Sequence, residues 1–172
     1  GCSRQCDYCL RAAARRVNSM PWVWVLELIG ALAEYKKQIK EYSLMIAYYS
    51  VLMSNFRNEA MADYYDSLFD KDYGDICAEL VARGEMVPSL STAGIEIGSI
   101  GERALNKMIA VNKGGFVIPS LHINTQSELF RRLGRAKYIE AMRHTWLLLE
   151  KLSANTDSFK EWRAFRAKPW SS

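Results

Sequence analysis

Apolar residues in the first third of the chain recur in alternating steps of four and three. This spacing is typical of a helix that packs one apolar stripe against a neighbouring element. Asn18-Ser19 followed by Pro21 provides a capping side chain and a proline suited to the first turn of a helix. No proline interrupts residues 22–87, so the pattern predicts one long N-terminal helix over about 20–70. The stripe consists of Leu28, Leu32, Tyr35, Ile39, Tyr42, Ile46, Tyr49, Met53, Phe56 and Ala60.

The length of this helix conflicts with the size of the chain. A helix over 20–70 would be on the order of 75 Å long at ~1.5 Å per residue. The chain has 172 residues, and a compact domain of that size is roughly 40 Å across. We therefore expect either that the helix breaks near 54–58 or that it projects and is covered by another element.

Capping and glycine patterns predict three further helices. Gly74 precedes a short helix over 75–83, which Gly84 closes. Ser99 and Glu102 form a capping-box pattern that begins a helix ending at residue 111. A second capping box, over 125–128, begins a helix to about residue 153, in which the apolar face changes after Gly134.

The fold class predicted from these elements is mainly α. We expect an irregular helical bundle with at most a minor two-strand β element, near 95–97 and 116–118, where short apolar runs lie between turn residues. The predicted organisation is a Cys- and Arg-containing N-terminal segment over 1–19 and a single helical domain over 20–172.

Composition narrows the class of protein. Hydrophobic residues make up 49% and charged residues 24% of the chain, which is typical of a globular protein rather than a disordered one. The longest apolar runs fall short of the ~20 residues that a transmembrane helix needs. No secretory signal pattern is present, and the four cysteines do not suggest a disulfide framework. We expect an intracellular protein, cytoplasmic or in an organelle matrix, that is not secreted.

The amount of apolar helical surface predicts partner proteins. The turn over 146–149 is apolar on every side, as is usual for a helix that is covered all round. The sequence has no HExxH, P-loop or nucleophile-elbow motif, so we expect no enzymatic activity and no cofactor. The predicted function is that of a non-catalytic structural or adaptor subunit of a larger assembly, acting through helix–helix contacts. The predicted partner-binding residues are Leu28, Leu32, Tyr35, Ile39, Tyr42, Tyr49, Trp146, Leu147 and Leu148.

Charge supports an alternative function. The net charge of +4 combines an acidic stretch over 57–87 with a basic stretch over 128–168. Arginines near the aromatic residues of that basic stretch suit phosphate contacts and base stacking, so an RNA- or DNA-associated helical protein is the alternative. The same arginines equally suit pairing with the acidic stretch or with another subunit. The candidate nucleic-acid-binding residues are Arg131, Arg132, Arg135 and Arg143.

Three cysteines give a second alternative. Cys2, Cys6 and Cys9, with Tyr8 before the third, resemble the cluster-binding loop of the radical S-adenosylmethionine enzymes. That resemblance implies three thiolates holding a four-iron cluster. A zinc site would need a fourth ligand from a remote segment, namely Cys77, His122 or His144. Because the rest of the chain is predicted to be helical, we favour reduced thiols on a segment that packs against a partner.

Two other polar groupings are interpreted as structural. The acidic run over 70–75 lacks the spacing of a calcium loop and predicts a solvated helix junction. His144 lies one helical turn after Glu140, which is not the spacing of a di-iron motif. We expect His144 to be a core or interface residue.

Overall fold

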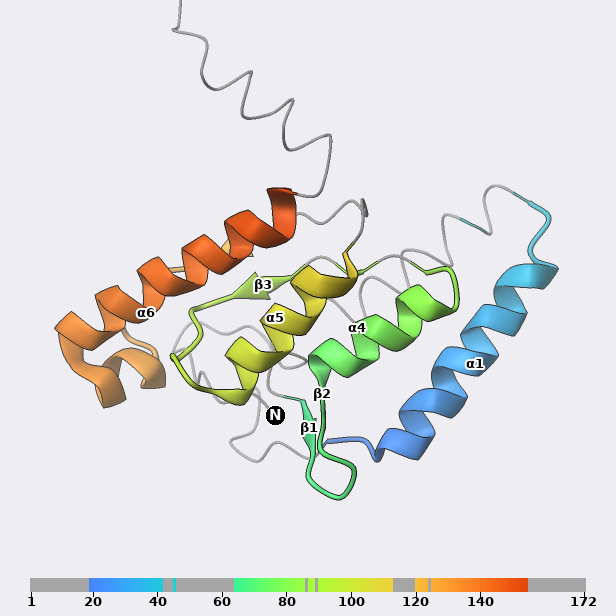
Figure 1. The fold of residues 1–172 in the computed structure, drawn as a ribbon, viewed down its shortest axis with the longest axis horizontal. Coiled ribbons are helices and arrows are strands. Elements are labelled where there is room, and N and C mark those ends of the chain that lie inside the picture. Colours follow the sequence, from blue (N-terminus) through green and yellow to red (C-terminus); the bar gives the residue numbers. More distant parts are fainter. Residues whose placement is uncertain are drawn as a thin grey trace, which may run out of the picture.

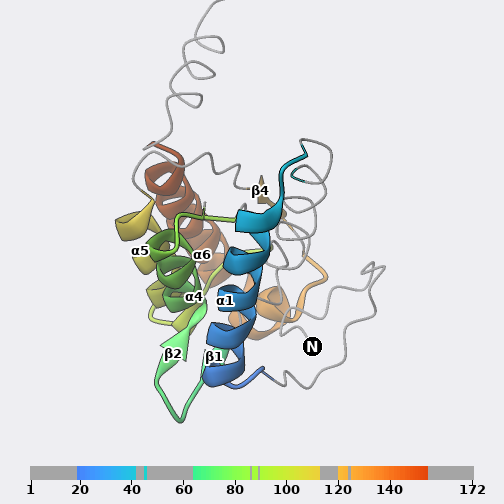
Figure 2. The same cartoon turned by 90° about the vertical axis from the view of Figure 1, so that its right-hand side faces the viewer.

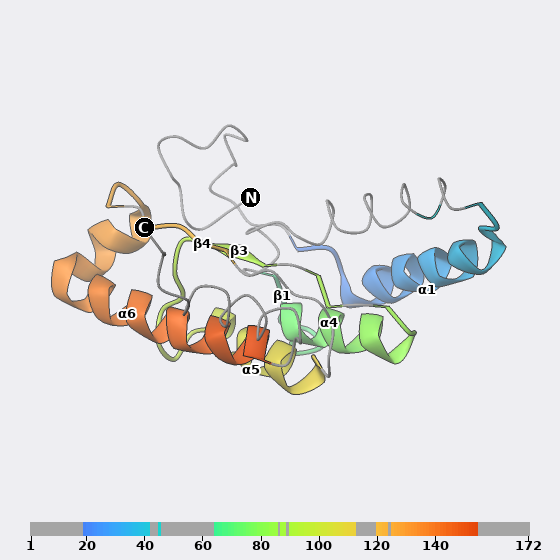
Figure 3. The same ribbon diagram turned by 90° about the horizontal axis from the view of Figure 1, so that it is seen from above.

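A computed structural model of the chain describes residues 19–41, 45, 64–85, 87–88, 90–112, 120–123 and 125–154. This part of the chain is mostly helical, with two small two-stranded β elements, which confirms the predicted fold class at that level. Figure 1 shows the helices side by side, with α5 lying between α4 and α6 and with α1 on the other side of α4. The same order is seen from above in Figure 3.

Helix α1 spans Trp22–Gln38 and is shorter than predicted. Ile39 is extended, with φ −77° and ψ 114°, so the predicted helix over 20–70 ends early. The far end of the predicted helix is a hairpin, in which β1 (Tyr65–Asp66) pairs antiparallel with β2 (Lys71–Asp72). The prediction of one continuous helix is therefore wrong at Ile39, where the backbone is extended, and at the hairpin, where it forms strands. Residues 42–44 and 46–63, including the predicted break near 54–58, lie outside the described residues.

The start of α1 is where the sequence places it, but its cap comes from elsewhere. Pro21 occupies the N-cap position and makes no side-chain hydrogen bond. The hairpin residue Asp66 supplies the cap instead, since its Oδ2 accepts a hydrogen bond from the Trp22 backbone N–H at 2.7 Å. Ser19, expected to cap α1, accepts a hydrogen bond from the backbone N–H of Tyr65.

The core-facing stripe of α1 is rotated from the predicted one. Val25 and Ile29 are buried in the main core, and Trp22 and Leu32 pack against it. These residues recur every three or four positions, as the predicted stripe does, but they lie on a neighbouring face of the helix, and only Leu32 belongs to both series. Leu28 and Tyr35 are exposed on the flank of the helix as a result.

Helices α4 (Tyr73–Ala82) and α5 (Ile100–Val111) pack closely on one another. Their contact depends on Gly74, because a Cβ atom there would lie only 2.6 Å from the backbone oxygen of Ala104. Gly84 follows α4 with φ 79°, as its predicted capping role requires. The Ser99 hydroxyl caps α5 by accepting the Glu102 backbone N–H, which confirms the predicted helix start.

Helix α6 spans Glu128–Ala154 and contains a break at Gly134. Gly134 has φ 71° and ψ 168°, a conformation that favours glycine, and this break changes the direction of the apolar face. The cap of α6 is Ser127 rather than Thr125, since the Ser127 Oγ accepts the Phe130 backbone N–H at 3.2 Å. The end of α6 agrees with the prediction.

The second β element lies near the predicted position but uses other residues. Strand β3 (Ser91–Thr92) pairs in parallel with β4 (Ser120–Leu121). Ile95, which was predicted to lie in a strand, is buried, and its backbone N–H donates to Thr145 Oγ1 at 2.9 Å. This contact ties the segment after β3 to α6 instead of to a second strand. Residues 116–118 lie outside the described residues.

The main core is shared by all these helices. Its buried members come from α1, Tyr64 just before β1, α4, the segment after α4, α5 and the last turns of α6. Leu148 is 4% exposed and packs in this core with Leu149 and Leu152. The prediction of Leu148 as a partner contact is therefore wrong. The view in Figure 2 shows α1 packed in front of the α4–α5–α6 group, with the hairpin turn below.

Candidate protein-docking groove

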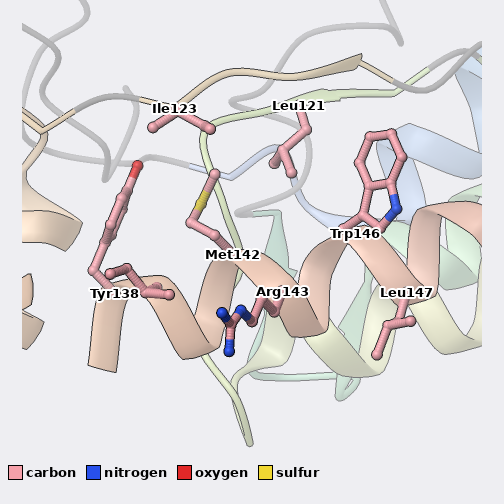
Figure 4. A pocket seen from close by; sticks show the side chains of 8 residues that line it. Leu121, Ile123, Tyr138, Met142, Arg143, Trp146 and Leu147 are labelled. Atoms are coloured by element: carbon pink, nitrogen blue, oxygen red, sulfur yellow. The ribbon is translucent and has the colours of Figure 1, made fainter. Parts of the chain in front are cut away.

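An open apolar groove of about 530 Å³ runs along α6 after the break at Gly134. One wall is α6 and the other is β4 with the residues that follow it. Figure 4 shows Tyr138, Met142 and Trp146 reaching from α6 toward Leu121 and Ile123. The α6 groove is lined by Leu121, Ile123, Tyr138, Ile139, Met142, Arg143, Trp146 and Leu147.

The floor of the α6 groove is rigidly packed. Tyr138 and Met142 are buried in a small second core cluster with Leu129. The ring of Phe130 contacts the ring of Tyr138 edge to face, with 5.1 Å between centroids. The backbone at Gly94 approaches so closely that a Cβ there would lie 2.5 Å from the Met142 sulfur. These contacts hold the floor in place, so a ligand would not have to order it.

The rim of the α6 groove is exposed and apolar. Trp146 is 52% and Leu147 is 56% exposed, and Ile123 is still more accessible. Among the described residues that line the groove, Arg143 is the one that carries a charge. A surface of this kind favours contact with apolar groups and with one negative charge.

The structure places the predicted partner-binding residues in different parts of the molecule. Trp146 and Leu147 line the α6 groove, whereas Leu28 and Tyr35 are exposed on α1 at the other end of the row of helices (Figure 1). Leu32 and Ile39 are partly buried against the main core. Tyr42 and Tyr49 lie outside the described residues.

Several groove residues were not predicted as contacts. Tyr138, Met142 and Trp146 follow one another at intervals of one helical turn, so the spacing of apolar residues along α6 could have identified the first two. Leu121 and Ile123 carry no such signal. They reach the groove only because β4 pairs with β3, a contact between distant parts of the chain.

The four candidate nucleic-acid-binding arginines do not form one free basic surface. Arg132 makes two hydrogen bonds to the carboxylate of Glu96, at 3.0 and 2.6 Å, and this contact raises the pKa of the guanidinium. Arg131 donates to the backbone oxygen of Gln126 at 2.8 Å. Arg135 is exposed, and Arg143 lies at the groove. Two of the four are thus engaged within the molecule.

The acidic run over 70–75 joins two helices through ion pairs. The carboxylate of Asp72 is fully buried and contacts Arg103 Nε at 2.7 Å and Lys107 Nζ at 3.0 Å. Lys107 also pairs with Asp75 at 2.6 Å, and Arg103 with Asp70 at 3.0 Å. The expected solvated junction is therefore a partly buried charge network that joins the start of α4 to α5.

His144 pairs with a residue that the sequence did not indicate. Its Nε2 lies 2.6 Å from Glu102 Oε1, which connects α6 to α5. The pKa of Glu102 is lowered, chiefly by the backbone N–H of Gly98 and then by His144. The pair bridges two helices, in agreement with the expectation that His144 is a core or interface residue.

The described residues include no group of three or more His, Cys, Asp or Glu side chains arranged to hold a metal ion. Cys2, Cys6 and Cys9 lie outside the described residues, so a zinc or iron–sulfur site there stays a prediction. Cys77 is a buried free thiol whose pKa is raised by burial. It is therefore protonated and poorly nucleophilic at neutral pH.

Comparisons of the chain with models of known protein families, with curated proteins and with solved structures found no match. Within the described residues, every helix is too short or too polar to cross a membrane.

Proposed function

We propose that the chain is a non-catalytic structural or adaptor subunit that binds an amphipathic helix of a partner protein in the α6 groove. The observation that carries the proposal is the exposed apolar rim of the groove over a prepacked floor. An exposed Trp on a helix is a typical anchor for a partner helix, because Trp is enriched among the residues that dominate binding energies at interfaces.

The size of the rim side chains supports a specific contact. Complete burial of a large apolar side chain stabilises a contact by about 1.5–3 kcal/mol. Trp146 and Leu147 are each about half exposed, so their burial together would contribute roughly 2–3 kcal/mol to binding. Arg143 at the same groove favours a partner helix that carries a carboxylate beside its apolar face.

The proposal is tested by the mass of the native particle. A tagged copy of the full chain is purified gently from its source, and the intact particle is weighed by native mass spectrometry. The chain itself has a mass of 19.7 kDa. We expect the wild type in a heavier particle and the Trp146→Ser/Leu147→Ser variant as the bare chain, because the variant lacks the apolar rim.

The matched control is Ile97→Ser, which removes a similarly exposed apolar side chain outside the groove. We expect this variant to remain in the heavy particle. A wild type that is purified as a folded monomer contradicts the proposal. A groove variant that retains the full particle mass contradicts the assignment to α6.

A further inference from the structure

Two arginines of α6, at the edge of the groove, have no partner in the described part of the chain. Arg135 and Arg143 are exposed, and no hydrogen bond or ion pair joins either side chain to another described residue. The other arginines that the structure describes each lie 3.9 Å or less from a carboxylate oxygen; these are Arg83, Arg103, Arg131 and Arg132. The two unpaired guanidinium groups are therefore available to a group outside the molecule.

Both arginines belong to one row of exposed side chains on α6, after the break at Gly134. In this row, which we call the α6 ridge, each member lies four residues after the one before it, and the members are Arg135, Ile139, Arg143 and Leu147. Ile139 is 42% and Leu147 is 56% exposed. In Figure 4 the side chains of Arg143 and Leu147 extend from the outer side of α6, whereas that of Trp146 extends across the groove. The α6 ridge therefore alternates positive charge with large apolar side chains.

Rows of this kind are the surface on which a second helix packs. Side chains four residues apart form a ridge inclined by about 26° to the helix axis, and the ridge fits between the side chains of the partner helix. Arg135 and Arg143 are 143 − 135 = 8 residues apart, which is about 12 Å along the helix. A complementary helix would carry two carboxylates at this separation, with an apolar side chain between them.

Other negatively charged ligands match the α6 ridge less well. Phosphates along a nucleic acid are polar on every side, so they do not cover the exposed Ile139 between the two arginines. An anionic lipid layer suits a protruding apolar face, whereas the apolar floor here is recessed between α6 and β4. Glu140 is exposed and lies three residues before Arg143, but no ion pair joins the two, so this glutamate does not neutralise the ridge.

We propose that the partner helix in the α6 groove is acidic and carries two carboxylates about eight residues apart, which pair with Arg135 and Arg143. This inference rests on the proposed function and adds the chemical class of the partner. Apolar residues of the same helix cover Ile139 and the exposed rim at Trp146 and Leu147. The ion pairs fix the register of the partner and reject other amphipathic helices, since charges at an interface contribute to specificity more than to affinity.

The test combines charge reversal with the measurement of the native particle. In the Arg135→Glu/Arg143→Glu variant of the full chain, like charges oppose the carboxylates of the partner. We expect the fraction of chain recovered in the heavy particle to fall at least about tenfold, because like charges across an interface are strongly unfavourable. The matched control is Lys40→Glu/Lys137→Glu, which changes the net charge equally at two exposed lysines outside the groove. It should remain in the heavy particle.

The reciprocal exchange is made in the partner. The protein released from the wild-type particle is identified by mass spectrometry, and its carboxylates at the expected spacing are replaced by lysine. We expect the altered partner to leave the wild type and to bind the Arg135→Glu/Arg143→Glu variant, because the charges are complementary again. All four exchanged side chains of this chain are exposed, and circular dichroism of each variant verifies that the helices are intact.

The inference and the proposed function fail in different ways. A wild type that is purified as the bare chain overturns both. If the Trp146→Ser/Leu147→Ser variant loses the particle but the Arg135→Glu/Arg143→Glu variant keeps it as the control does, only the acidic partner is overturned. Failure of the altered partner to bind the reversed variant also overturns it. So does a particle whose extra mass is nucleic acid, lipid or further copies of this chain.

Discussion

The buried carboxylate of Asp72 gives the sharpest test of how this fold is held together. Asp72 is the N-cap of α4, where it accepts the backbone N–H groups of Gly74 and Asp75 at 2.9 and 3.3 Å. The same carboxylate pairs with Arg103 and Lys107 of α5. Removing it therefore weakens both the start of α4 and the contact between α4 and α5.

The expected loss in the free energy of unfolding follows from these two roles of Asp72. Loss of an N-cap costs about 0.5–2 kcal/mol. Breaking a buried ion pair costs about 3–5 kcal/mol when the remaining charge stays buried. Here the side chains of Arg103 and Lys107 are 41% and 36% exposed, so water can solvate them and the ion-pair contribution is smaller. We expect Asp72→Ala to lower the free energy of unfolding by about 2–4 kcal/mol.

Asp72→Asn separates the two contributions. Asparagine caps a helix about as well as aspartate, so this variant keeps the cap and loses the charge. We expect it to lower the free energy of unfolding by about 1–2 kcal/mol, less than the alanine variant. The measurement is urea unfolding followed by circular dichroism, with the midpoint and the slope fitted for each variant.

The matched control is Lys37→Met on α1. Lys37 pairs with Glu34 at 2.6 Å, but both side chains are about two-thirds exposed. Exposed pairs contribute less than about 1 kcal/mol, so the urea midpoint should move little. If Asp72→Ala shifts the midpoint no more than Lys37→Met does, the network does not stabilise the fold and the reasoning is refuted.

Three further predictions concern backbone geometry and pH. Gly74→Ala should lower the unfolding midpoint strongly in urea, because its Cβ would meet the Ala104 oxygen at 2.6 Å; an unchanged midpoint would contradict the close helix contact. Gly134→Ala has open space around it but φ 71°, so thermal unfolding should show a loss of about 1–3 kcal/mol from backbone strain alone. Stability should be constant above about pH 5 and fall below pH 4 in an acid titration. The reason is that the pKa of Asp70 is lowered by Arg103, and that of Asp75 is lowered by the Asp72 backbone N–H and Lys107, which outweigh the effect of burial. A group with a lowered folded-state pKa stabilises the fold above its unfolded pKa and loses that effect as protons bind. Stability that does not change down to pH 3 would contradict these assignments.

Local signals in the sequence predicted some of the helix boundaries, whereas α1 ends at Gln38 instead of near residue 70 and α6 is capped by Ser127 instead of Thr125. Gly84, Ser99 and Gly134 act through their own backbone or side chain, within a few residues, so the pattern of residues is enough to place them. Of the predicted apolar stripe, Leu32 packs against the core, whereas Leu28 and Tyr35 are exposed. Both flanks of α1 are apolar, and only the positions of α4 and the hairpin decide which flank is covered.

Features that depend on distant contacts could not be predicted. The hairpin has no Asn-Gly or similar turn signal. Asp66 holds the turn by local hydrogen bonds, but the contacts that dock the hairpin on the rest of the fold come from Trp22 and Arg103. The α6 groove needs the pairing of β3 with β4, which two-residue strands do not reveal. Of the fully apolar turn over 146–149, Trp146 and Leu147 are exposed and Leu148 is buried, because the core of the molecule covers only one side of the turn.

The capping of α1 by Asp66 couples two parts of the chain that are 44 residues apart. The two oxygens of this carboxylate accept amides from different segments: Oδ2 accepts the amide of Trp22 in α1, and Oδ1 accepts the amide of Leu68 within the hairpin turn. The amide of Trp22 is therefore bonded only while the two segments are together, and its hydrogen exchange should report their separation. An amide in the first turn of a helix has no partner within that helix, so slow exchange of Trp22 would show that its protection originates in the docking of a distant hairpin.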